Sequence, residues 1–317
     1  MDSDEEEMKA MRGSKRTILI LLWVLRLYVP YYTGMACTGL LHFFGKFKTR
    51  GNSAQVQGPG SFSWPQLASC SGVALFGISA QSLNWTGNML AGSSVFAVVY
   101  ASVTIWSAVL SWLLLQRVLT LWQWLSIIAV FAGLAVTGVD ARSTGDCIFL
   151  GTCMIGAGTI LHATCHVLSE MLSVRGSRIP AHLNASIQGL TGCAVVGVWQ
   201  LAFTASHWQR ISEPMEEIGT SWLQASLLLS SVALGNFVHA GTFFYLLTRV
   251  GAVSTGMAKA LQGVVVFALS HVLYCRQDES QCFSLAKGLS LLIVTAGVVS
   301  YVLATSSAKS SAKQTSS

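Results

Sequence analysis

Lys259 is the side chain of this sequence best suited to binding an anion inside an apolar helix. It lies ten residues beyond Arg249, which is about 15 Å along an α-helix and close to the middle of a bilayer. A cation at that depth is costly and usually faces a cavity or a partner. Thr255, Lys259 and Gln262 recur at helical spacing, which predicts one polar stripe. We expect no Asp or Glu at that depth, so a phosphate-bearing ligand would supply the opposing charge. Alternatively, the long side chain extends to the cytoplasmic interface.

Two further polar sets lie within apolar runs. Asn236 and His239 share one face of a predicted helix, where each could bind a ligand or form a hydrogen bond to a neighbouring helix. His162, His166 and Glu170 are spaced by four residues, an arrangement that suits a metal site or a proton relay. We expect an interfacial polar face instead, because this set approaches the cytoplasmic end of its helix.

The sequence contains no motif of an enzyme or a cofactor site. It has no P-loop, no dinucleotide-binding fingerprint and no nucleophile elbow, and no CxxC pair of the kind that binds zinc. We therefore expect no catalytic activity, no cofactor and no metal. Most of the eight cysteines lie in apolar runs and are expected to act as small hydrophobic residues. Cys275 and Cys282 flank a polar loop and could form a disulfide if that loop faces an oxidising lumen.

The composition places these residues in a membrane protein. Charged residues make up 10% of the 317 residues and the mean hydropathy is +0.58, whereas a soluble protein carries about 25% charged residues. Such a composition excludes a disordered chain. The scattered Lys and Arg exclude a nucleic-acid binder, despite a net charge of +6. The stretches without any charged residue have the length of a spanning helix or a multiple of it: 51–116, 118–139, 147–169, 218–248 and 288–308.

These runs predict an all-α membrane protein with nine spans. Barrel strands would alternate polar and apolar residues over about ten positions, and the runs here are continuous. Residues 1–16 form a charged N-terminal tail, and 305–317 form a Ser/Lys-rich C-terminal tail. The predicted spans are 17–44, 66–86, 89–115, 121–139, 147–170, 183–205, 221–247, 251–275 and 284–304.

Charge is distributed unevenly between alternate loops, and cytoplasmic loops are enriched in Lys and Arg. One set carries nine cations and no acid: Lys46, Lys48, Arg50, Arg117, Arg175, Arg178, Arg249, Lys309 and Lys313. The other set, which contains Arg276, mixes four cations with seven acids. We expect the first set and the C-terminus in the cytoplasm. The cations before residue 17 also suggest a cytoplasmic N-terminus, but 17–44 is too short to cross twice. Either the N-terminus lies on the far side or a helix is missing.

An internal repeat is visible in two pairs of segments. VLSWLLLQR (109–117) matches ALSHVLYCR (268–276) at an offset of 159, and IAVFAG (128–133) matches LIVTAG (292–297) at an offset of 164. The third span thus pairs with the eighth and the fourth with the ninth. The step of five spans is odd, so the copies are expected in opposite orientations, as in many secondary transporters.

The repeat divides the chain into a first half, 17–139, and a second half, 147–304. The fifth span would need a partner before residue 17, which suggests an ancestral ten-span pattern of which this chain carries nine. The offset of 159 relates Lys259 to Tyr100. We therefore expect Tyr100 to face the same central cavity, where it could stack on a base or donate a hydrogen bond. The alternative is an aromatic side chain packed between helices.

The paired segments resemble a known family. FAVVYASVTIWSAVLSWLLLQRVLTLWQWLSIIAVFAGLAV looks like the fourth and fifth helices of the drug/metabolite transporter superfamily, and GAVSTGMAKALQGVVVFALSHVLYC with KGLSLLIVTAGVVSYVLA looks like its ninth and tenth. The lysine of MAKALQ is similar to that of the nucleotide-sugar and triose-phosphate transporter branch. The resemblance implies that Lys259 approaches a substrate phosphate. The acidic residue usual after the fourth helix is replaced by Gln116–Arg117.

We therefore expect a secondary transporter that moves an anionic organic solute across the bilayer by alternating access. A nucleotide sugar is the first expectation for the solute, and antiport against a nucleoside monophosphate follows by analogy. The alternatives are a carrier of a neutral or cationic metabolite and a degenerate member that does not transport. The resemblance suggests the Golgi or another endomembrane, and the chain could pair as a homodimer. No nucleic-acid partner is expected.

Overall fold

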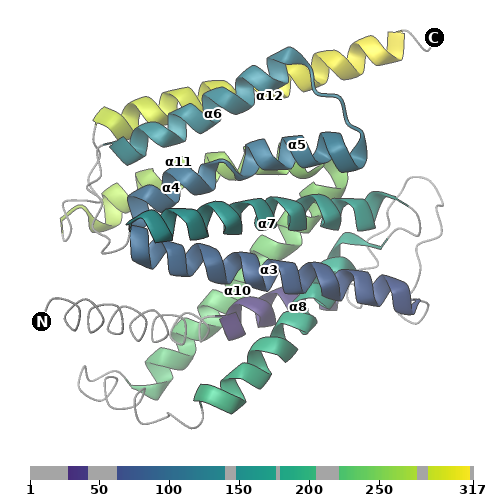
Figure 1. Cartoon of the computed structure of the whole chain (residues 1–317). Coiled ribbons are helices and arrows are strands. Elements are labelled where there is room, and N and C mark those ends of the chain that lie inside the picture. Colours follow the sequence, from purple (N-terminus) through teal and green to yellow (C-terminus); the bar gives the residue numbers. More distant parts are fainter. Residues whose placement is uncertain are drawn as a thin grey trace, which may run out of the picture. The chain divides into compact units, whose positions relative to one another are not determined.

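The computed structural model describes residues 28–41, 63–139, 148–175, 179–204, 221–276 and 285–314. These residues form helices and short connections, and no strand occurs among them (Figure 1). The segment 28–41 is helical over 28–37. The other elements are α3 (Trp64–Ala91), α4 (Ser93–Ala101), α5 (Val103–Leu115), α6 (Leu121–Val139), α7 (Ile148–Val174), α8 (Ala181–Trp199), a π-helical turn (Gln200–Thr204), α10 (Trp222–Val250), α11 (Ala252–Tyr274) and α12 (Leu285–Gln314).

Four of these helices are long and apolar enough to cross a membrane. They cover Ile148–Val174, Ala181–Ala202, Trp222–Val250 and Gly288–Ser307, and two shorter apolar stretches cover Val99–Leu115 and Leu121–Val136. Large apolar side chains of α10 point outward: Leu223, Leu227, Leu228 and Leu234 are each between 61% and 68% exposed. Lipid tails can cover such a surface, whereas water-soluble proteins rarely expose large apolar patches. The expectation of an all-α membrane protein therefore agrees with these helices.

Two glycines mark sharp breaks between consecutive helices. Gly92 separates α3 from α4 and Gly251 separates α10 from α11, and both have φ of 90°. L-residues with a side chain rarely adopt this conformation, so glycine is favoured at both positions. The predicted segment 89–115 differs in its start, because α3 continues to Ala91. No charged residue marks this boundary in the sequence, and the break depends on the backbone of one glycine.

The chain forms two compact units, each built from two stretches of sequence. Unit 1 comprises 1–82 and 168–249, and unit 2 comprises 83–167 and 250–317. The core of unit 2 brings together α5, α6, α11 and α12. Its buried members are Ala108, Ile127, Val130, Val253, Met257, Val294, Val298 and Tyr301.

Within unit 2, α6 and α12 lie side by side (Figure 1). A β carbon added at Gly133 would lie 3.0 Å from the Val294 side chain, and one added at Gly297 would lie 2.8 Å from the Val130 side chain. Small residues allow helices in membranes to approach closely in this way. Val130 of α6 meets Gly297 of α12, and the later residue Gly133 meets the earlier residue Val294. The two helices are therefore antiparallel. Helix α12 also continues to Gln314, through most of the predicted C-terminal tail.

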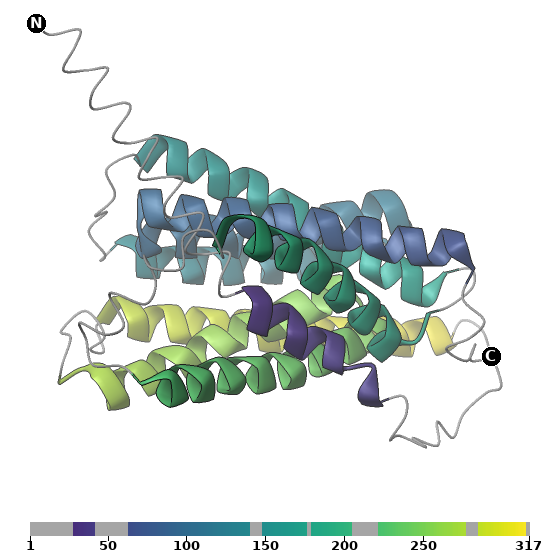
Figure 2. The same cartoon turned by 90° about the horizontal axis from the view of Figure 1, so that it is seen from below.

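Unit 1 is organised around the segment 28–41, which packs on α8 (Figure 2). A β carbon at Gly189 would lie 2.3 Å from the Ala36 backbone nitrogen, which shows how closely the two backbones approach. Ser186 Oγ donates to the Ala36 carbonyl oxygen over 2.8 Å, and Thr38 Oγ1 donates to the His182 carbonyl oxygen over 3.0 Å. Hydroxyl groups and a small residue therefore join these helices.

Candidate functional site

Lys259 and Tyr100 contact each other in unit 2. Lys259 Nζ lies 3.2 Å from Tyr100 Oη, to which it donates a hydrogen bond, and 5.4 Å from the centroid of the Tyr100 ring. Lys259 is on the second turn of α11, after the break at Gly251, and is half-buried. Tyr100 is at the end of α4, where Phe96 stacks on its ring at a centroid distance of 5.0 Å. The ammonium group is therefore held both by a phenol oxygen and near an aromatic face, an arrangement that favours a cation.

A third helix of the same unit adds an imidazole to this contact. Tyr100 Oη and His162 Nδ1 are 3.5 Å apart, and the two ring centroids are 5.8 Å apart. One turn further along α7, the His166 ring lies 4.8 Å from the His162 ring between centroids. We call Lys259, Tyr100, His162 and His166 the charged cluster. It combines an ammonium donor, a hydroxyl that can donate and accept, and two imidazoles.

The charged cluster suits the binding of an anion more than catalysis. A lysine ammonium has three N–H donors and no acceptor, so it can add a phosphate oxygen to its hydrogen bond with Tyr100. The Tyr100 and Phe96 rings offer flat apolar surface beside it. Among the described residues, no group of three or more His, Cys, Asp or Glu side chains is arranged to hold a metal ion.

The structure thus brings together Lys259 and Tyr100, two residues that the predicted repeat relates. Thr255 lies one turn before Lys259, but its Oγ1 donates to the Gly251 carbonyl oxygen over 2.8 Å and its side chain is buried. Its hydroxyl therefore forms a hydrogen bond to the residue that precedes its own helix. Gln262 belongs to α11, and its side chain lies outside the described part of the structure.

Asn236 and His239 are on α10, in unit 1, and not in the unit that holds Lys259. Asn236 Nδ2 donates to the Tyr31 carbonyl oxygen, a hydrogen bond that holds α10 to the segment 28–41. His239 is exposed and stacks on Phe243 at a centroid distance of 6.1 Å. Of the two roles weighed for Asn236, this hydrogen bond corresponds to helix–helix pairing.

The polar stripe of α7 differs from the expected interfacial face. His166 is 7% exposed and Glu170 is 0% exposed, so both are buried within the protein. The sequence places them near the end of an apolar run, and it contains no signal for the helices that cover them. Contact of His162 with Tyr100 is the feature that sequence reasoning missed, since the two residues are 62 positions apart.

Unit 1 contains a different polar cluster, built from amides and hydroxyls. Asn184 Nδ2 donates to the Ser169 carbonyl oxygen over 3.1 Å and to Ser173 Oγ over 3.0 Å. Gln188 Nε2 donates to Asn184 Oδ1 over 2.8 Å and to Ser169 Oγ over 3.0 Å, and Cys70 Sγ donates to Asn184 Oδ1 over 3.5 Å. We call these five residues the amide cluster. It joins α3, α7 and α8, and its hydrogen bonds indicate a structural role.

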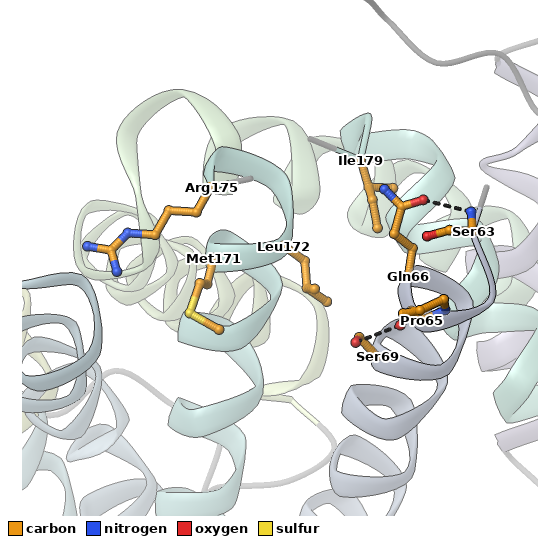
Figure 3. A pocket seen from close by; sticks show the side chains of 8 residues that line it. All are labelled: Ser63, Pro65, Gln66, Ser69, Met171, Leu172, Arg175 and Ile179. Carbon is orange, nitrogen blue, oxygen red and sulfur yellow. Dashed lines mark hydrogen bonds between the residues drawn. The ribbon is translucent and has the colours of Figure 1, made fainter. Parts of the chain in front are cut away.

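A cavity of about 400 Å³ lies in unit 1 where α7 ends and α3 begins (Figure 3). Two of its polar side chains bond to nearby backbone: Gln66 Oε1 accepts from the Ser63 amide over 2.9 Å, and Ser69 Oγ donates to the Pro65 carbonyl oxygen over 2.8 Å. In Figure 3 the Arg175 guanidinium points away from these groups. The cavity is lined by Ser63, Pro65, Gln66, Ser69, Met171, Leu172, Arg175 and Ile179.

The fold is similar to that of a solved structure described only as "Crystal structure of protein". The two share a TM-score of 0.65 at 15% sequence identity, over 88% of this chain and 89% of the other. It is among 27 chains of solved structures that match. The sequence matches no family model and no curated protein. The structural likeness therefore describes the fold, and the ligand must be argued from the site.

Proposed function

We propose that the protein is a secondary transporter of the drug/metabolite transporter type, which moves an organic, phosphate-bearing solute across a membrane by alternating access. A nucleotide sugar is the first candidate for the solute, with antiport against a nucleoside monophosphate. The observation that carries this proposal is the contact between Lys259 and Tyr100, because the two residues occupy equivalent positions in the two predicted repeats.

The helix bounds support the repeat. Residues 93–115, which α4 and α5 occupy, correspond at an offset of 159 to residues 252–274, the bounds of α11. The starts of α6 and α12, Leu121 and Leu285, differ by the second offset, 164. Gly92 and Gly251 are also 159 residues apart and have the same φ of 90°. These matching bounds and backbone angles support the predicted repeat.

The contacts between the two copies support opposite orientations. Gly133 lies against Val294, and Gly297 lies against Val130. The offset of 164 relates Gly133 to Gly297 and Val130 to Val294, so exchanging the two copies turns one contact into the other. Such reciprocity is expected of two elements related by a two-fold axis. Tyr100 and Lys259 contact each other directly, so they would lie on that axis. In transporters built from inverted repeats, the substrate site lies at the interface of the repeats near the bilayer midplane.

An anionic solute fits this position best. An ammonium within an apolar helix is costly, and a phosphate would offset that cost through charge-assisted hydrogen bonds. The stacked Phe96 and Tyr100 rings could receive the flat base of a nucleotide. The Lys259 ammonium would thus bind the phosphate of such a solute, and the aromatic rings would bind its base.

The disulfide bond of Cys275 supports the proposed orientation in the membrane. Cys282, the partner considered from the sequence, lies outside the described residues. Disulfides persist in oxidising compartments such as the lumen of the endoplasmic reticulum. Arg276 would then face a lumen and the C-terminus the cytoplasm, in an endomembrane such as the Golgi. This orientation agrees with the charge of the loops.

Counter-exchange in liposomes tests the proposal. The reconstituted protein is loaded with UMP and screened for uptake of UDP-glucose, GDP-mannose, glucose 6-phosphate and neutral amino acids, together with Lys259→Ala and the matched control Lys309→Ala. We expect exchange of a phosphate-bearing solute, reduced about 100-fold by Lys259→Ala, which corresponds to about 2.7 kcal/mol. The control should retain exchange. Exchange of neutral solutes that Lys259→Ala leaves intact would favour the other transporter branch, and no exchange at all would favour a non-transporting member.

A further inference from the structure

We propose that His162 is a proton-binding site coupled to Lys259 through Tyr100, so that a proton enters the site together with the anionic solute. The inference rests on the proposed transport function and names its coupling ion. Three helices of unit 2 supply the three side chains: α7 carries His162, α4 carries Tyr100 and α11 carries Lys259. The two successive contacts, of 3.2 Å and 3.5 Å, form one chain of hydrogen-bonding groups.

The hydrogen bond from Lys259 to Tyr100 has a defined direction, and the direction of the contact between Tyr100 and His162 depends on the His162 tautomer. The Lys259 ammonium can only donate, so the Tyr100 oxygen accepts at this contact. The hydroxyl hydrogen of Tyr100 is then available to His162 Nδ1, which must be unprotonated to accept it. The remaining hydrogen of a neutral His162 would lie on Nε2. Proton transfer along the chain requires this tautomer of His162, in which Nδ1 accepts.

The same direction permits transfer of a proton from Lys259 to His162. The Lys259 N–H bond breaks as a new O–H bond forms on Tyr100, while the original Tyr100 O–H bond breaks and an N–H bond forms at His162 Nδ1. Lysine becomes a neutral amine, tyrosine is unchanged and the imidazole becomes an imidazolium. No electron is exchanged, and no co-reactant is needed. The positive charge can thus reside on Lys259 or on His162, with the Tyr100 hydroxyl between them.

Few other titratable groups surround His162 in unit 2. His166 lies 4.8 Å away between ring centroids and is the nearest further base. Cys165 is on α7 as well and is buried, and Glu170 is buried in the part of α7 that belongs to unit 1. Helix α3 packs against α7, where a β carbon on Gly87 would lie 2.7 Å from the Gly151 carbonyl oxygen. Residues 83–91 of that helix contain no titratable side chain, and neither does α5.

An anionic solute would change how many protons this chain holds. Without the solute, charges on both Lys259 and His162 would repel each other across one hydroxyl, so one of the two bases stays neutral. A phosphate beside them stabilises both charges, and His162 then takes up a proton from water. Solute and proton would therefore bind together and cross together. For one linked proton, the affinity for the solute rises by up to about tenfold for each pH unit of decrease.

Two measurements on the full-length protein test this inference. The first is UDP-glucose uptake into liposomes without internal nucleotide, together with UDP-glucose affinity, between pH 6 and pH 8 and with a pH dye trapped inside. We expect proton entry with UDP-glucose in the wild type. We expect His162→Gln to flatten the pH dependence of UDP-glucose affinity and to stop proton entry, because glutamine accepts the Tyr100 hydrogen bond but holds no proton. His271→Gln, an exposed histidine of α11, is the matched control and should behave as the wild type.

The second measurement is ¹⁵N NMR of the histidine rings, which does not depend on transport. We expect an unprotonated Nδ1 on His162, a change of that signal in Tyr100→Phe, and its protonation when UMP is added. A His162 signal that ignores both Tyr100→Phe and UMP would overturn the inference. So would UDP-glucose uptake into nucleotide-free liposomes without proton movement, although the transport function would then stand. If no solute is exchanged or bound, the transport function fails and the proton coupling fails with it.

Discussion

The amide cluster and the charged cluster are both polar groups within apolar helices, yet their geometries differ. In the amide cluster the hydrogen bonds between nitrogen and oxygen measure 2.8–3.1 Å. In the charged cluster the contacts measure 3.2 Å and 3.5 Å, and one member is an ammonium. A network of neutral groups that satisfy one another joins helices. A looser chain that contains a charge can still gain from a ligand, which is why we assign binding to the second cluster and structure to the first.

The sharpest test of the amide cluster is Asn184→Leu. The substitution removes the hydrogen bonds of Asn184 to Ser169, Ser173, Gln188 and Cys70. It leaves the polar atoms of the buried partners without their acceptor or donor, so we expect a loss of about 2–4 kcal/mol of stability. The measurement is the midpoint of thermal unfolding in detergent. Solute affinity of the folded fraction should stay unchanged, and a large loss of affinity would assign ligand binding to this cluster as well.

The opposite pattern is expected for Lys259→Met. The variant replaces an ammonium with an apolar side chain of similar length, so the midpoint of thermal unfolding should stay the same or rise. The wild type should be stabilised by about 2.7 kcal/mol when UDP-glucose is present at 100 times its Kd, and the variant should lose this stabilisation. Lys259→Arg serves as the control that retains charge. If Lys259→Met unfolds at a markedly lower temperature, the role of Lys259 is structural.

A smaller effect is expected from Gly251→Ala, which changes the start of α11. Alanine is strained at φ of 90°, and the cost is about 1–3 kcal/mol. Because α11 carries Lys259, solute affinity should fall together with stability, whereas the amide cluster should be unaffected. Gly241→Ala is a suitable control, since a β carbon there meets only one atom, at 3.7 Å. Equal unfolding midpoints for the two variants would contradict this assignment.

The smallest effect is expected from Thr255→Val. The residue shares the helix face of Lys259, but its hydroxyl is bonded to the Gly251 carbonyl oxygen. Removing an intrahelical side-chain bond of this kind should change stability by less than about 1 kcal/mol. Exchange of UDP-glucose should stay within about twofold of the wild type, as measured in the same liposome assay. A larger loss of exchange would extend the binding site along the predicted polar stripe.

The sequence was informative wherever a property depends on local pattern. Continuous apolar runs predicted helices that the structure contains, and each predicted segment overlaps one. The offset of 159 pairs Tyr100 with Lys259, and these residues contact each other, while the inverted repeat itself stays a prediction. Both inferences use composition and periodicity, which a single chain displays directly.

Other features depend on pairing between distant segments and could not be predicted. The contact of Tyr100 with His162 requires the packing of α4 near α7, and the burial of Glu170 requires helices that cover it. Predicting the amide cluster requires knowing how α7 and α8 are rotated about their axes relative to each other. The periodicity of the sequence does not define this rotation. The continuation of α12 to Gln314 was also missed, because its Ser and Lys residues indicate solvent exposure without excluding a helix.

The interruption at Ser102 makes the two copies unequal. One copy is divided there into α4 and α5, and Ser102 Oγ donates to the Val99 carbonyl oxygen over 2.6 Å. The corresponding position in the other copy, Leu261, lies within the unbroken α11. In the proposed transporter, two halves that differ next to Tyr100 would have no symmetry that makes the inward-facing and outward-facing states equal in energy. The proposed transporter would then be able to favour one of these states and to bind the solute with different affinities on the two sides of the membrane, and exchanging Ser102 and Leu261 would be a direct way to change that preference.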